Sequence, residues 1–419
     1  MMRKPPTILI HSGWNRYNFG DVAHTPGLLR LLEIYIPEAE ILLWMARYPE
    51  WLASYILARF PNVEPFYGQI SGVRNHVNSA IEDAFRRAEL FIYNSGPIFN
   101  YGHELVSSDV KTQGWRGFDW NATMDPAAKL YFAKSCQVPF GIFGQSFIYF
   151  APPADIVVPE ILSQAAFVTT RESDSLNYLN QLGVQSPDMD FVPDAAWAFD
   201  LQDDESVVPW LDSLGLKERH FLVTTTRNAP AGVDMMADRE RQQTFFSQVL
   251  TDWVEQTGLP ILLIPETVGS IELNREYIYA PLPAHIQSNV ILDDSLWMPT
   301  DTFWTPDQAR SVLARARAYL NVDHHGVLLA LTAGTPSIHP RQPQAGRKSN
   351  VLRDVGLADW LFDLYQVDPK LVSQALLKIH QDYEQAQQRA KKAVEIVHQA
   401  HKKRMIAIRK LLGLVCEKE

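Results

Sequence analysis

Short runs of apolar residues alternate along the chain with longer, helix-like stretches. The runs are rich in Val, Ile, Leu and Phe, which favour strands buried on both faces. In the first half, the predicted strands are Thr7–His11, Glu40–Leu43, Leu90–Tyr93, Phe140–Phe143, Ala166–Thr169 and Phe191–Pro193, and the helix-like stretches include Pro26–Ile36, Val73–Ala88 and Asp174–Leu182. This repeated order of strand and helix predicts a parallel sheet covered by helices on both faces.

The alternation is interrupted once. Residues 200–219 begin with an acidic stretch and contain Pro209 and Gly215, so we predict a linker there. The alternation then resumes, with strands predicted at His220–Thr225, Ile261–Pro265, Val290–Asp293, Tyr319–Val322 and Pro336–His339 and helices at Arg239–Thr257, Thr305–Ala318 and Gly326–Ala333. We therefore expect α/β domains at 1–199 and 220–368, with a cleft between them.

The last predicted segment, residues 369–419, consists of one or two long helices. Apolar residues lie near one face of the final helix, and basic residues lie mostly around them: Lys391, Lys392, Lys402, Lys403, Arg404, Arg409 and Lys410. A basic amphipathic helix is able to lie on an anionic membrane surface. We favour the alternative that its apolar face packs on the body of the protein, because most amphipathic helices of globular proteins do so.

Composition narrows the class of protein. The chain has 419 residues, 46% hydrophobic and 21% charged, which excludes a largely disordered or collagen-like chain. Its net charge of −10 gives no support to general nucleic-acid binding. Cys136 and Cys416 lie far apart and suit a reducing compartment better than a disulfide framework. No apolar stretch approaches the roughly 20 residues that cross a bilayer, so we expect a soluble, cytoplasmic protein.

Ligands of open parallel sheets bind beyond the carboxyl ends of the strands, so polar residues directly after predicted strands are candidates for function. In the first half these are Asp21, Gly96, Gln145, Ser146, Arg171 and Asp194. Glycine lets a ligand approach the backbone, Gln and Ser bond anions or sugar hydroxyls, and an arginine ahead of a helix favours phosphate or carboxylate. Each could instead serve a turn, a helix cap or a salt bridge.

In the second half, Arg227 again follows a strand, and Asp323-His324-His325 stands where a predicted buried strand meets a buried helix. A histidine at this place is able to act as an acid or a base near neutral pH. One alternative is a hydrogen-bonded structural pair of histidines. Another is a metal site, which we disfavour because adjacent histidines on a strand point to opposite faces and no third-ligand spacing is evident. Lys348 either adds positive charge to the site or belongs to a solvated loop.

Taken in order, these residues resemble the motifs of the polysaccharide pyruvyl transferase family from Ile8 to Leu364. The resemblance is carried by Asn18-Phe19-Gly20-Asp21, Asn94-Ser95-Gly96, Gly144-Gln145-Ser146, Thr170-Arg171-Glu172-Ser173 with Leu182-Gly183-Val184, Pro193-Asp194, His325 to Pro336, and Lys348 followed by Gly356-Leu357. Gly144-Gln145-Ser146 fits closely, Asn94-Ser95-Gly96 fits loosely, and Ser173 comes one position early. The family usually has an arginine two residues before the motif histidine, where this chain has Asp323.

The resemblance implies a glycosyltransferase-B-like fold of two Rossmann-like domains facing a central cleft, followed by a C-terminal helical segment. It implies transfer of a pyruvyl group from phosphoenolpyruvate to sugar hydroxyls, which forms a ketal in exopolysaccharide or cell-envelope biosynthesis and needs no metal or cofactor. On this basis we expect His325 to be the proton donor or base, and Arg171 and Arg227 to hold the donor's carboxylate and phosphate. Further substrate contacts are expected at Asp21, Gly96, Gln145, Ser146, Asp194 and Lys348.

Two other functions are compatible with the same architecture. One is a glycosyltransferase with a nucleotide-sugar donor, and the other is a non-catalytic sugar-binding relative, which Asp323 in place of the arginine would favour. The expected partners are phosphoenolpyruvate and a sugar or glycan acceptor, with no nucleic acid. The basic C-terminal helix leaves open a peripheral contact with the inner face of the membrane, and the sequence leaves the oligomeric state open.

Overall fold

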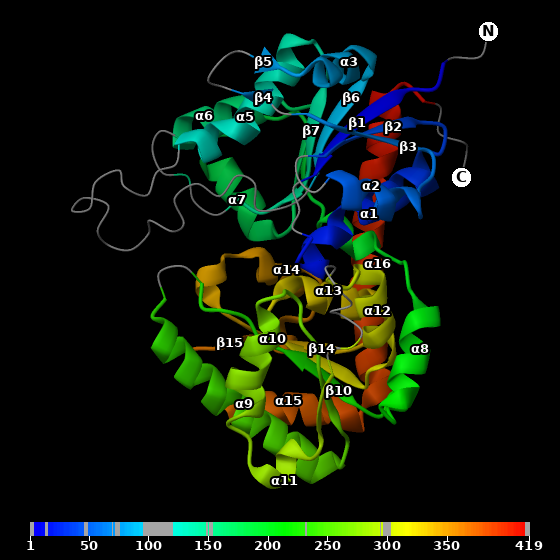
Figure 1. The fold of residues 1–419 in the computed structure, drawn as a ribbon. Helices are drawn as coiled ribbons and strands as arrows, with labels where there is room; N and C mark the ends of the chain where they lie inside the picture. Colours follow the sequence, from blue (N-terminus) through cyan, green and yellow to red (C-terminus); the bar gives the residue numbers. More distant parts are fainter. Residues whose placement is uncertain are drawn as a thin grey trace. The chain divides into compact units, whose positions relative to one another are not determined.

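Figure 1 shows the fold in a computed structural model, which describes residues 4–12, 16–45, 49–68, 70–71, 76–94, 120–147, 150, 154–230, 233–293, 295 and 303–414. The chain forms two compact units. Unit 1 comprises Met1–Trp14, His24–Ala198 and Val397–Glu419, and unit 2 comprises Asn15–Ala23 and Phe199–Ile396. The chain therefore enters unit 2 twice, first for a short segment near its beginning.

Unit 1 is built on a parallel sheet. In the described part of the chain its seven strands follow the order β3-β2-β1-β6-β7-β8-β9. They are β1 (Thr7–Ser12), β2 (Glu40–Met45), β3 (Val63–Tyr67), β6 (Leu90–Asn94), β7 (Phe140–Gln145), β8 (Phe167–Thr170) and β9 (Met189–Phe191). The helices are α1 (Phe19–Tyr35), which begins in the unit 2 segment, α2 (Pro49–Leu57), α3 (Ser79–Arg87), α5 (Trp120–Ser135), α6 (Ala154–Leu162), α7 (Ser173–Gln181) and the 3-10 helix η3 (Ala195–Ala198). A small antiparallel pair is formed by β4 (Ile70–Ser71) and β5 (His76–Val77).

The apolar character of the strands explains this arrangement. Strands β1, β6 and β7 are buried along their whole length, as expected when helices cover both faces of a sheet. On one face, residues of α3, α5 and α6 form a single hydrophobic cluster with Trp44, Phe91 and Ile142 of the sheet. The predicted parallel α/β architecture is confirmed in this unit.

Unit 2 contains a second parallel sheet. Its order is β12-β11-β10-β13-β14-β15 within the described residues. The strands are β10 (Leu222–Thr225), β11 (Ile261–Leu263), β12 (Val290–Leu292), β13 (Ala318–Asn321), β14 (Ser337–Arg341) and β15 (Leu361–Asp363). The helices are α8 (Asp204–Ser213), α9 (Met235–Thr257), α10 (Ser270–Leu273), the π-helix η4 (Asn274–Tyr279), α11 (Ala284–Gln287), α12 (Pro306–Arg315), α13 (His324–Thr332), α14 (Val351–Asp354) and α15 (Pro369–Gln381), with 3-10 turns η5 (Pro343–Ala345), η6 (Lys348–Asn350) and η7 (Ala358–Trp360). Helix α16 (Tyr383–Leu411) begins in unit 2 and belongs to unit 1 from Val397 onward.

The segment 200–219 differs from the predicted linker. It contains α8, whose Val207 and Leu211 are buried, and it belongs to unit 2. The acidic residues suggested a solvated connection, but they form the start of the helix. Asp203 is the N-cap, and its side chain accepts a hydrogen bond from the Ser206 amide. Acidic residues at this end of a helix are favoured by its dipole.

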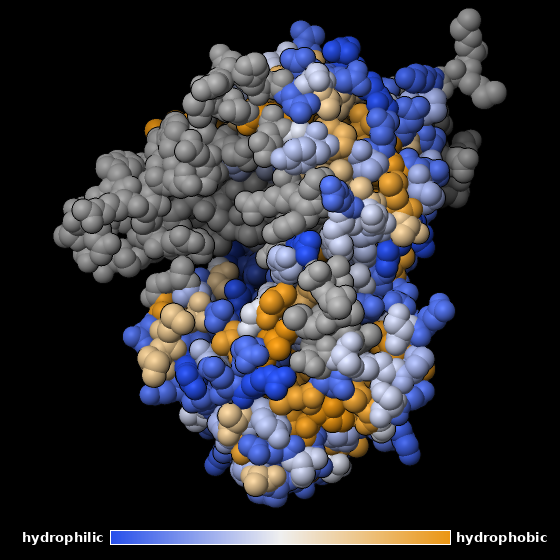
Figure 2. Space-filling view, viewed as in Figure 1, coloured by the Kyte–Doolittle hydropathy of each residue, from blue (hydrophilic) through white to orange (hydrophobic). Residues whose placement is uncertain are grey.

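The basic C-terminal helix packs its apolar side on the protein. In α16, Val397, Met405 and Ile408 are buried, and Arg404 is buried beside Asp188 of the same unit, with Nη2 2.8 Å from Oδ1. The apolar face is thus occupied by the protein itself. Among the described residues, no helix combines the length and the apolar content needed to cross a membrane. Hydrophilic residues cover much of the surface visible in Figure 2, as on other globular proteins.

Candidate functional site

Charged residues closely follow the ends of three neighbouring strands of unit 2. The sheet order places β10 between β11 and β13, and Arg227, Glu266 and Asp323 follow these strands. Parallel strands direct their carboxyl ends to one edge of the sheet, where ligands of such sheets bind. The side chains do converge there, because Nη1 of Arg227 donates a hydrogen bond to Oδ1 of Asp323 over 3.1 Å.

His325 lies in the first turn of α13, directly beyond β13. Asp323 is the N-cap of this helix, and its Oδ1 accepts a hydrogen bond of 2.7 Å from the His324 amide. The two histidines therefore lie on a helix, and their predicted placement on a strand, which disfavoured a metal site, is wrong. His325 is 2% exposed, and its Nδ1 lies 3.6 Å from Oδ1 of Asp21.

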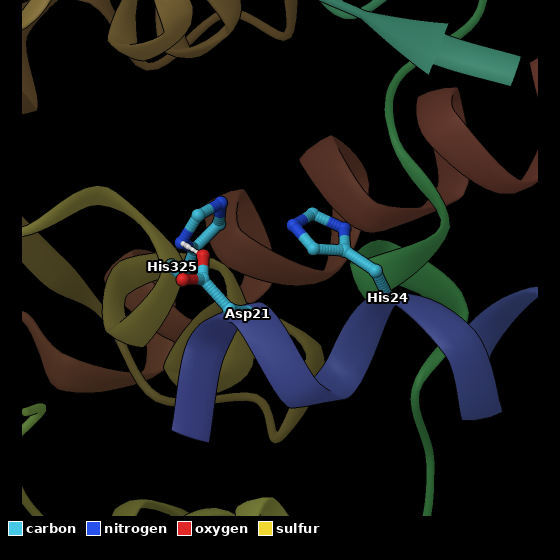
Figure 3. A group of neighbouring side chains, drawn as sticks. All are labelled: Asp21, His24 and His325. Carbon is cyan, nitrogen blue, oxygen red and sulfur yellow. Dashed lines mark ion pairs between the residues drawn. The ribbon is translucent and has the colours of Figure 1, made fainter. Parts of the chain in front are cut away.

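Asp21 reaches His325 because the start of α1 is anchored to unit 2. Asn18 forms an isolated bridge with Thr267, and its side chain accepts hydrogen bonds from the amides of Gly20 and Asp21. Figure 3 shows Asp21 projecting from α1 toward His325, with His24 one turn further along the same helix. Gly20 permits the approach, since a Cβ atom at this position would lie 2.2 Å from the Cβ of His325.

Two cations flank Asp323. Arg227 contacts it as described, and Nζ of Lys348 lies 3.8 Å from the same oxygen. The exposed fractions are 27% for Arg227 and 19% for Lys348, against 6% for the Asp323 side chain. Burial opposes the charge of Asp323, but Arg227 and Lys348 outweigh it and lower the pKa of this carboxyl. The site therefore combines a buried carboxylate with two cations that solvent reaches.

Glu266 is a central residue of this site that the sequence analysis missed. Its Oε2 accepts hydrogen bonds from Nδ2 of Asn321, over 2.7 Å, and from the Gly326 amide, over 3.1 Å. Burial, and then the charge of Asp323, raise the pKa of Glu266 well above its ordinary value. The signal was present, because Glu266 directly follows the predicted strand Ile261–Pro265 and meets the criterion applied to the other candidates.

The same side chains include a donor set of the kind that binds divalent cations. One atom from each of Glu266, Asp323 and His325 lies within 4.8 Å of the others. Both carboxyl groups already have partners, however. Glu266 accepts hydrogen bonds from Asn321 and Gly326. Asp323 is paired with the cations Arg227 and Lys348. We therefore interpret the cluster as a hydrogen-bonded charge network.

A second group of candidates lies in unit 1. Nε of Arg171 is 3.4 Å from Oδ2 of Asp194, and Nδ1 of His24 is 3.5 Å from Oδ1 of the same carboxylate. Both residues of the Arg171–Asp194 pair are almost fully buried. Gln145 donates to the Asn94 carbonyl, and Ser146 donates to Glu172. Gly96 lies outside the described residues.

The candidates thus form two groups, each within its own unit. Asp21, Arg227, His325 and Lys348 come together in unit 2, and Gln145, Ser146, Arg171 and Asp194 in unit 1. The unit 1 group is enclosed, with every member at most 2% exposed. The unit 2 group includes side chains that solvent reaches and is the better placed of the two to meet a soluble ligand.

Comparison with known families and structures agrees with the fold. The polysaccharide pyruvyl transferase model matches residues 18–339, and no curated protein sequence matches the chain. S. aureus MnaA with UDP has 14% identity and a TM-score of 0.59, with 99% of both chains covered. Anabaena Alr3699/HepE with UDP-glucose has 11% identity and a TM-score of 0.58, covering 97% of this chain and 100% of that one. Medicago truncatula UGT71G1 with UDP-glucose has 10% identity and a TM-score of 0.54, with 98% of both covered. These similarities confirm the glycosyltransferase-B-like α/β fold.

Proposed function

This chain belongs to the polysaccharide pyruvyl transferase family, and we propose that it transfers a pyruvyl group from phosphoenolpyruvate to two hydroxyls of a sugar. The proposed acceptor is a sugar of a polysaccharide or of a glycan precursor, and the product is a ketal. The observation that carries the proposal is the convergence of Arg227, Lys348 and His325 around Asp323 in unit 2.

The two cations suit the anionic donor. A guanidinium matches a carboxylate or a phosphate with two parallel hydrogen bonds, and an ammonium adds a point charge. Asp323 holds both side chains in place before the donor binds, which lowers the entropy lost on binding. Asp323, which stands where the family usually has an arginine, thus gathers two cations at the site.

His325 supplies the acid–base chemistry in this proposal. Its imidazole protonates the methylene carbon of the donor, which becomes a methyl group, and C2 of the donor accepts an electron pair from a sugar hydroxyl. The bond between C2 and the phosphate oxygen breaks, and the second hydroxyl completes the ketal. Of the two hydroxyl protons, one replaces the proton given to the methylene and the other leaves with phosphate. The Asp21 carboxylate, 3.6 Å from Nδ1, stabilises the imidazolium form.

Phosphate release tests the proposal. The full chain is incubated with phosphoenolpyruvate and a panel of pyranosides and lipid-linked sugars, and phosphate is followed together with the mass of the sugar product. We expect acceptor-dependent release and a product that has gained one pyruvyl ketal. Release without any acceptor, or no turnover with any member of the panel, would contradict the proposal.

Variants assign the roles. His325→Ala is expected to lower kcat by about 10²–10⁴-fold, the usual contribution of a general acid or base. His285→Ala is the matched control, because this histidine is 67% exposed and lies on α11. Arg227→Ala is expected to weaken phosphoenolpyruvate binding more than it lowers kcat. Arg171, buried beside Asp194 in unit 1, stays a sequence-based prediction, and unchanged donor binding in Arg171→Ala would remove it from the site.

A nucleotide-sugar glycosyltransferase is the second candidate function. It is favoured by the structural neighbours whose structures contain UDP or UDP-glucose. Calorimetry separates the two candidates, since the pyruvyl transferase binds phosphoenolpyruvate and the glycosyltransferase binds uridine or cytidine diphosphate. Acceptor binding without turnover by either donor would support a non-catalytic sugar-binding protein.

A further inference from the structure

Glu266 and Asp323 bring two carboxyl groups together in the interior of unit 2. One oxygen of each lies within 4.8 Å of the other, and the residues are 0% and 4% exposed. Two carboxylates this close and this buried repel one another strongly, because little water screens their charges. A proton on one of the two groups relieves this repulsion, and the two groups titrate together.

The surroundings place this proton on Glu266. Asp323 is flanked by Arg227 and Lys348, whereas Glu266 receives its hydrogen bonds from the neutral side chain of Asn321 and the amide of Gly326. Burial and the neighbouring Asp323 raise the pKa of Glu266, and the two cations lower the pKa of Asp323. A proton taken up by the pair is therefore expected on Glu266, while Asp323 stays ionised.

A bound anion changes the protonation equilibrium of Glu266 and Asp323. Arg227 and Lys348 are the only two cations that the structure places within salt-bridge distance of Asp323 in the described part of the chain, and both are partly exposed. A dianion bound to them shares the positive charge that stabilises Asp323, and it adds negative charge beside the pair. Both effects favour the protonated forms of the two carboxyls.

We propose that binding of an anion at Arg227 and Lys348 is coupled to proton uptake by the Glu266–Asp323 pair. The coupling rests on the proposed function in one respect, since it takes the phosphate of the donor as the natural anion. It places a proton within 4.8 Å of a ring nitrogen of His325 at the moment when the donor is bound. By linkage, the affinity for the anion falls as pH rises through the titration of the pair.

Other titratable groups around the pair are Asp21, Tyr319, His324, His325 and His339. Burial raises the pKa of Tyr319 well above its ordinary value, so its hydroxyl stays protonated. Burial lowers the pKa of His339 to about 4, so this imidazole stays neutral between pH 6 and 9. His324 and His325 are the remaining alternative acceptors of the proton. Substitution of each histidine distinguishes it from the carboxyl pair as the acceptor.

Calorimetry on the full chain tests the coupling. Sulfate is the first probe because it does not titrate at these pH values, and phosphoenolpyruvate is the second. Each is titrated between pH 6 and 9 in two buffers of different ionisation enthalpy, and the difference in heat gives the number of protons taken up. We expect uptake of up to one proton per anion and, at full uptake, about a tenfold loss of affinity per pH unit.

Variants identify the acceptor of the proton. Glu266→Gln, whose amide oxygen still accepts from Asn321 and Gly326, is expected to bind sulfate without uptake, and Asp323→Asn gives an independent check. Asp307→Asn, a buried carboxyl on α12 of the same unit, is the control and should keep the wild-type uptake. His324→Gln and His325→Gln should also keep it.

The outcomes separate the two proposals. Binding of phosphoenolpyruvate with no proton uptake in the wild-type protein overturns the coupling and leaves the proposed function intact. Uptake that disappears in a histidine variant but persists in Glu266→Gln also overturns it. Failure of both anions to bind at any pH overturns the coupling and the proposed donor site together. The wild-type measurement decides whether anion binding takes up a proton even if a variant does not fold.

Discussion

Gly20 sets how closely α1 approaches the catalytic candidate His325. A Cβ atom at residue 20 would lie 2.2 Å from the Cβ of His325 and 3.1 Å from Oε1 of Glu266. Gly326, on the other side of Glu266, is similarly confined, since its Cβ would lie 2.5 Å from Oε2. A carboxyl enclosed between two glycines is deprived of water, which explains why its pKa is raised.

We predict that Gly20→Ala destabilises unit 2 and lowers activity. Alanine has the better helix propensity and would stabilise an unconfined helical site, but here it must displace the backbone of α13, and such overpacking costs about 1–3 kcal/mol. Urea unfolding measures the loss. Gly269→Ala is the control, because the nearest atoms to its Cβ would be 3.7 Å and 3.8 Å away. Equal stability of the two variants would show that the site accommodates the methyl group.

At the scale of elements, strand β7 carries an irregularity that serves the unit 1 group. Its pairing with β8 shifts register between Ile142 and Gln145, and Gly144 adopts a φ of +59°. The Gly144 amide donates to Oγ1 of Thr169, and a Cβ at Gly144 would lie 2.5 Å from Cα of Asp194. The irregular strand end therefore lets the backbone around Asp194 approach the sheet closely.

Gly144→Ala is predicted to be more destabilising than Gly183→Ala. Both glycines have positive φ, which costs an alanine roughly 1–2 kcal/mol, but nothing lies within 4 Å of a Cβ at Gly183. The additional loss of unfolding free energy in Gly144→Ala reflects the clash with Asp194. We expect it to be about 1–3 kcal/mol. Thermal unfolding of the two variants gives the comparison. A smaller effect at Gly144 would mean that the Asp194 backbone moves without cost.

The apolar strands were predictable from the sequence, and the exceptions have physical reasons. Strand β1, whose centre Ile8-Leu9-Ile10 is apolar, was predicted to within one residue. Strand β3, Val63–Tyr67, was missed because it contains Glu64 and Pro65, which are disfavoured in the middle of a sheet. Strand β15, Leu361–Asp363, has only three residues, all half-buried, which is too short for a pattern to emerge.

The site was predictable only in part. The criterion of polar residues at strand ends identified Arg227 and His325, because it depends on the local order of strand and loop. The contact of Asp21 with His325 joins distant parts of the chain, and no local pattern encodes it. The pairing of Arg227 with Asp323 depends on β10 and β13 being neighbours, which the order of strands along the chain does not specify.

At the scale of the whole molecule, the net charge of −10 does not describe the local charge of either group of candidate residues. In the unit 2 group Arg227 and Lys348 flank the carboxyl of Asp323, and the unit 1 group has Arg171 beside Asp194. The buried charged groups Asp323, Arg171 and Asp194 each have a partner of opposite charge, as buried charges require. An acidic surface is therefore compatible with an anionic ligand, whose binding depends on the local charge.

Each unit also contains a deeply buried neutral histidine, and together these predict an acid limit to stability. Burial lowers the pKa of His401 in unit 1 and of His339 in unit 2 to about 4, from an ordinary value of 6.5. As pH falls, these histidines are protonated in the unfolded chain before they are protonated in the folded protein. The contribution of the neutral histidines to the free energy of unfolding is therefore complete above pH 6.5 and is lost as pH falls toward 4. Both units are thus expected to lose stability over the same range.

His401→Gln tests this for unit 1. Nε2 of His401 bonds the Pro193 carbonyl over 2.9 Å, and a glutamine amide can donate to the same oxygen without titrating. We expect the variant to be less stable than the wild type at pH 7.5, because it loses the ring packing against Phe143, and to lose less stability between pH 6.5 and 4.5. Urea unfolding at several pH values measures both effects, with the exposed His285→Gln as the control. Parallel pH profiles for wild type and His401→Gln would remove His401 as a source of the acid limit, because only a titrating group can change the slope.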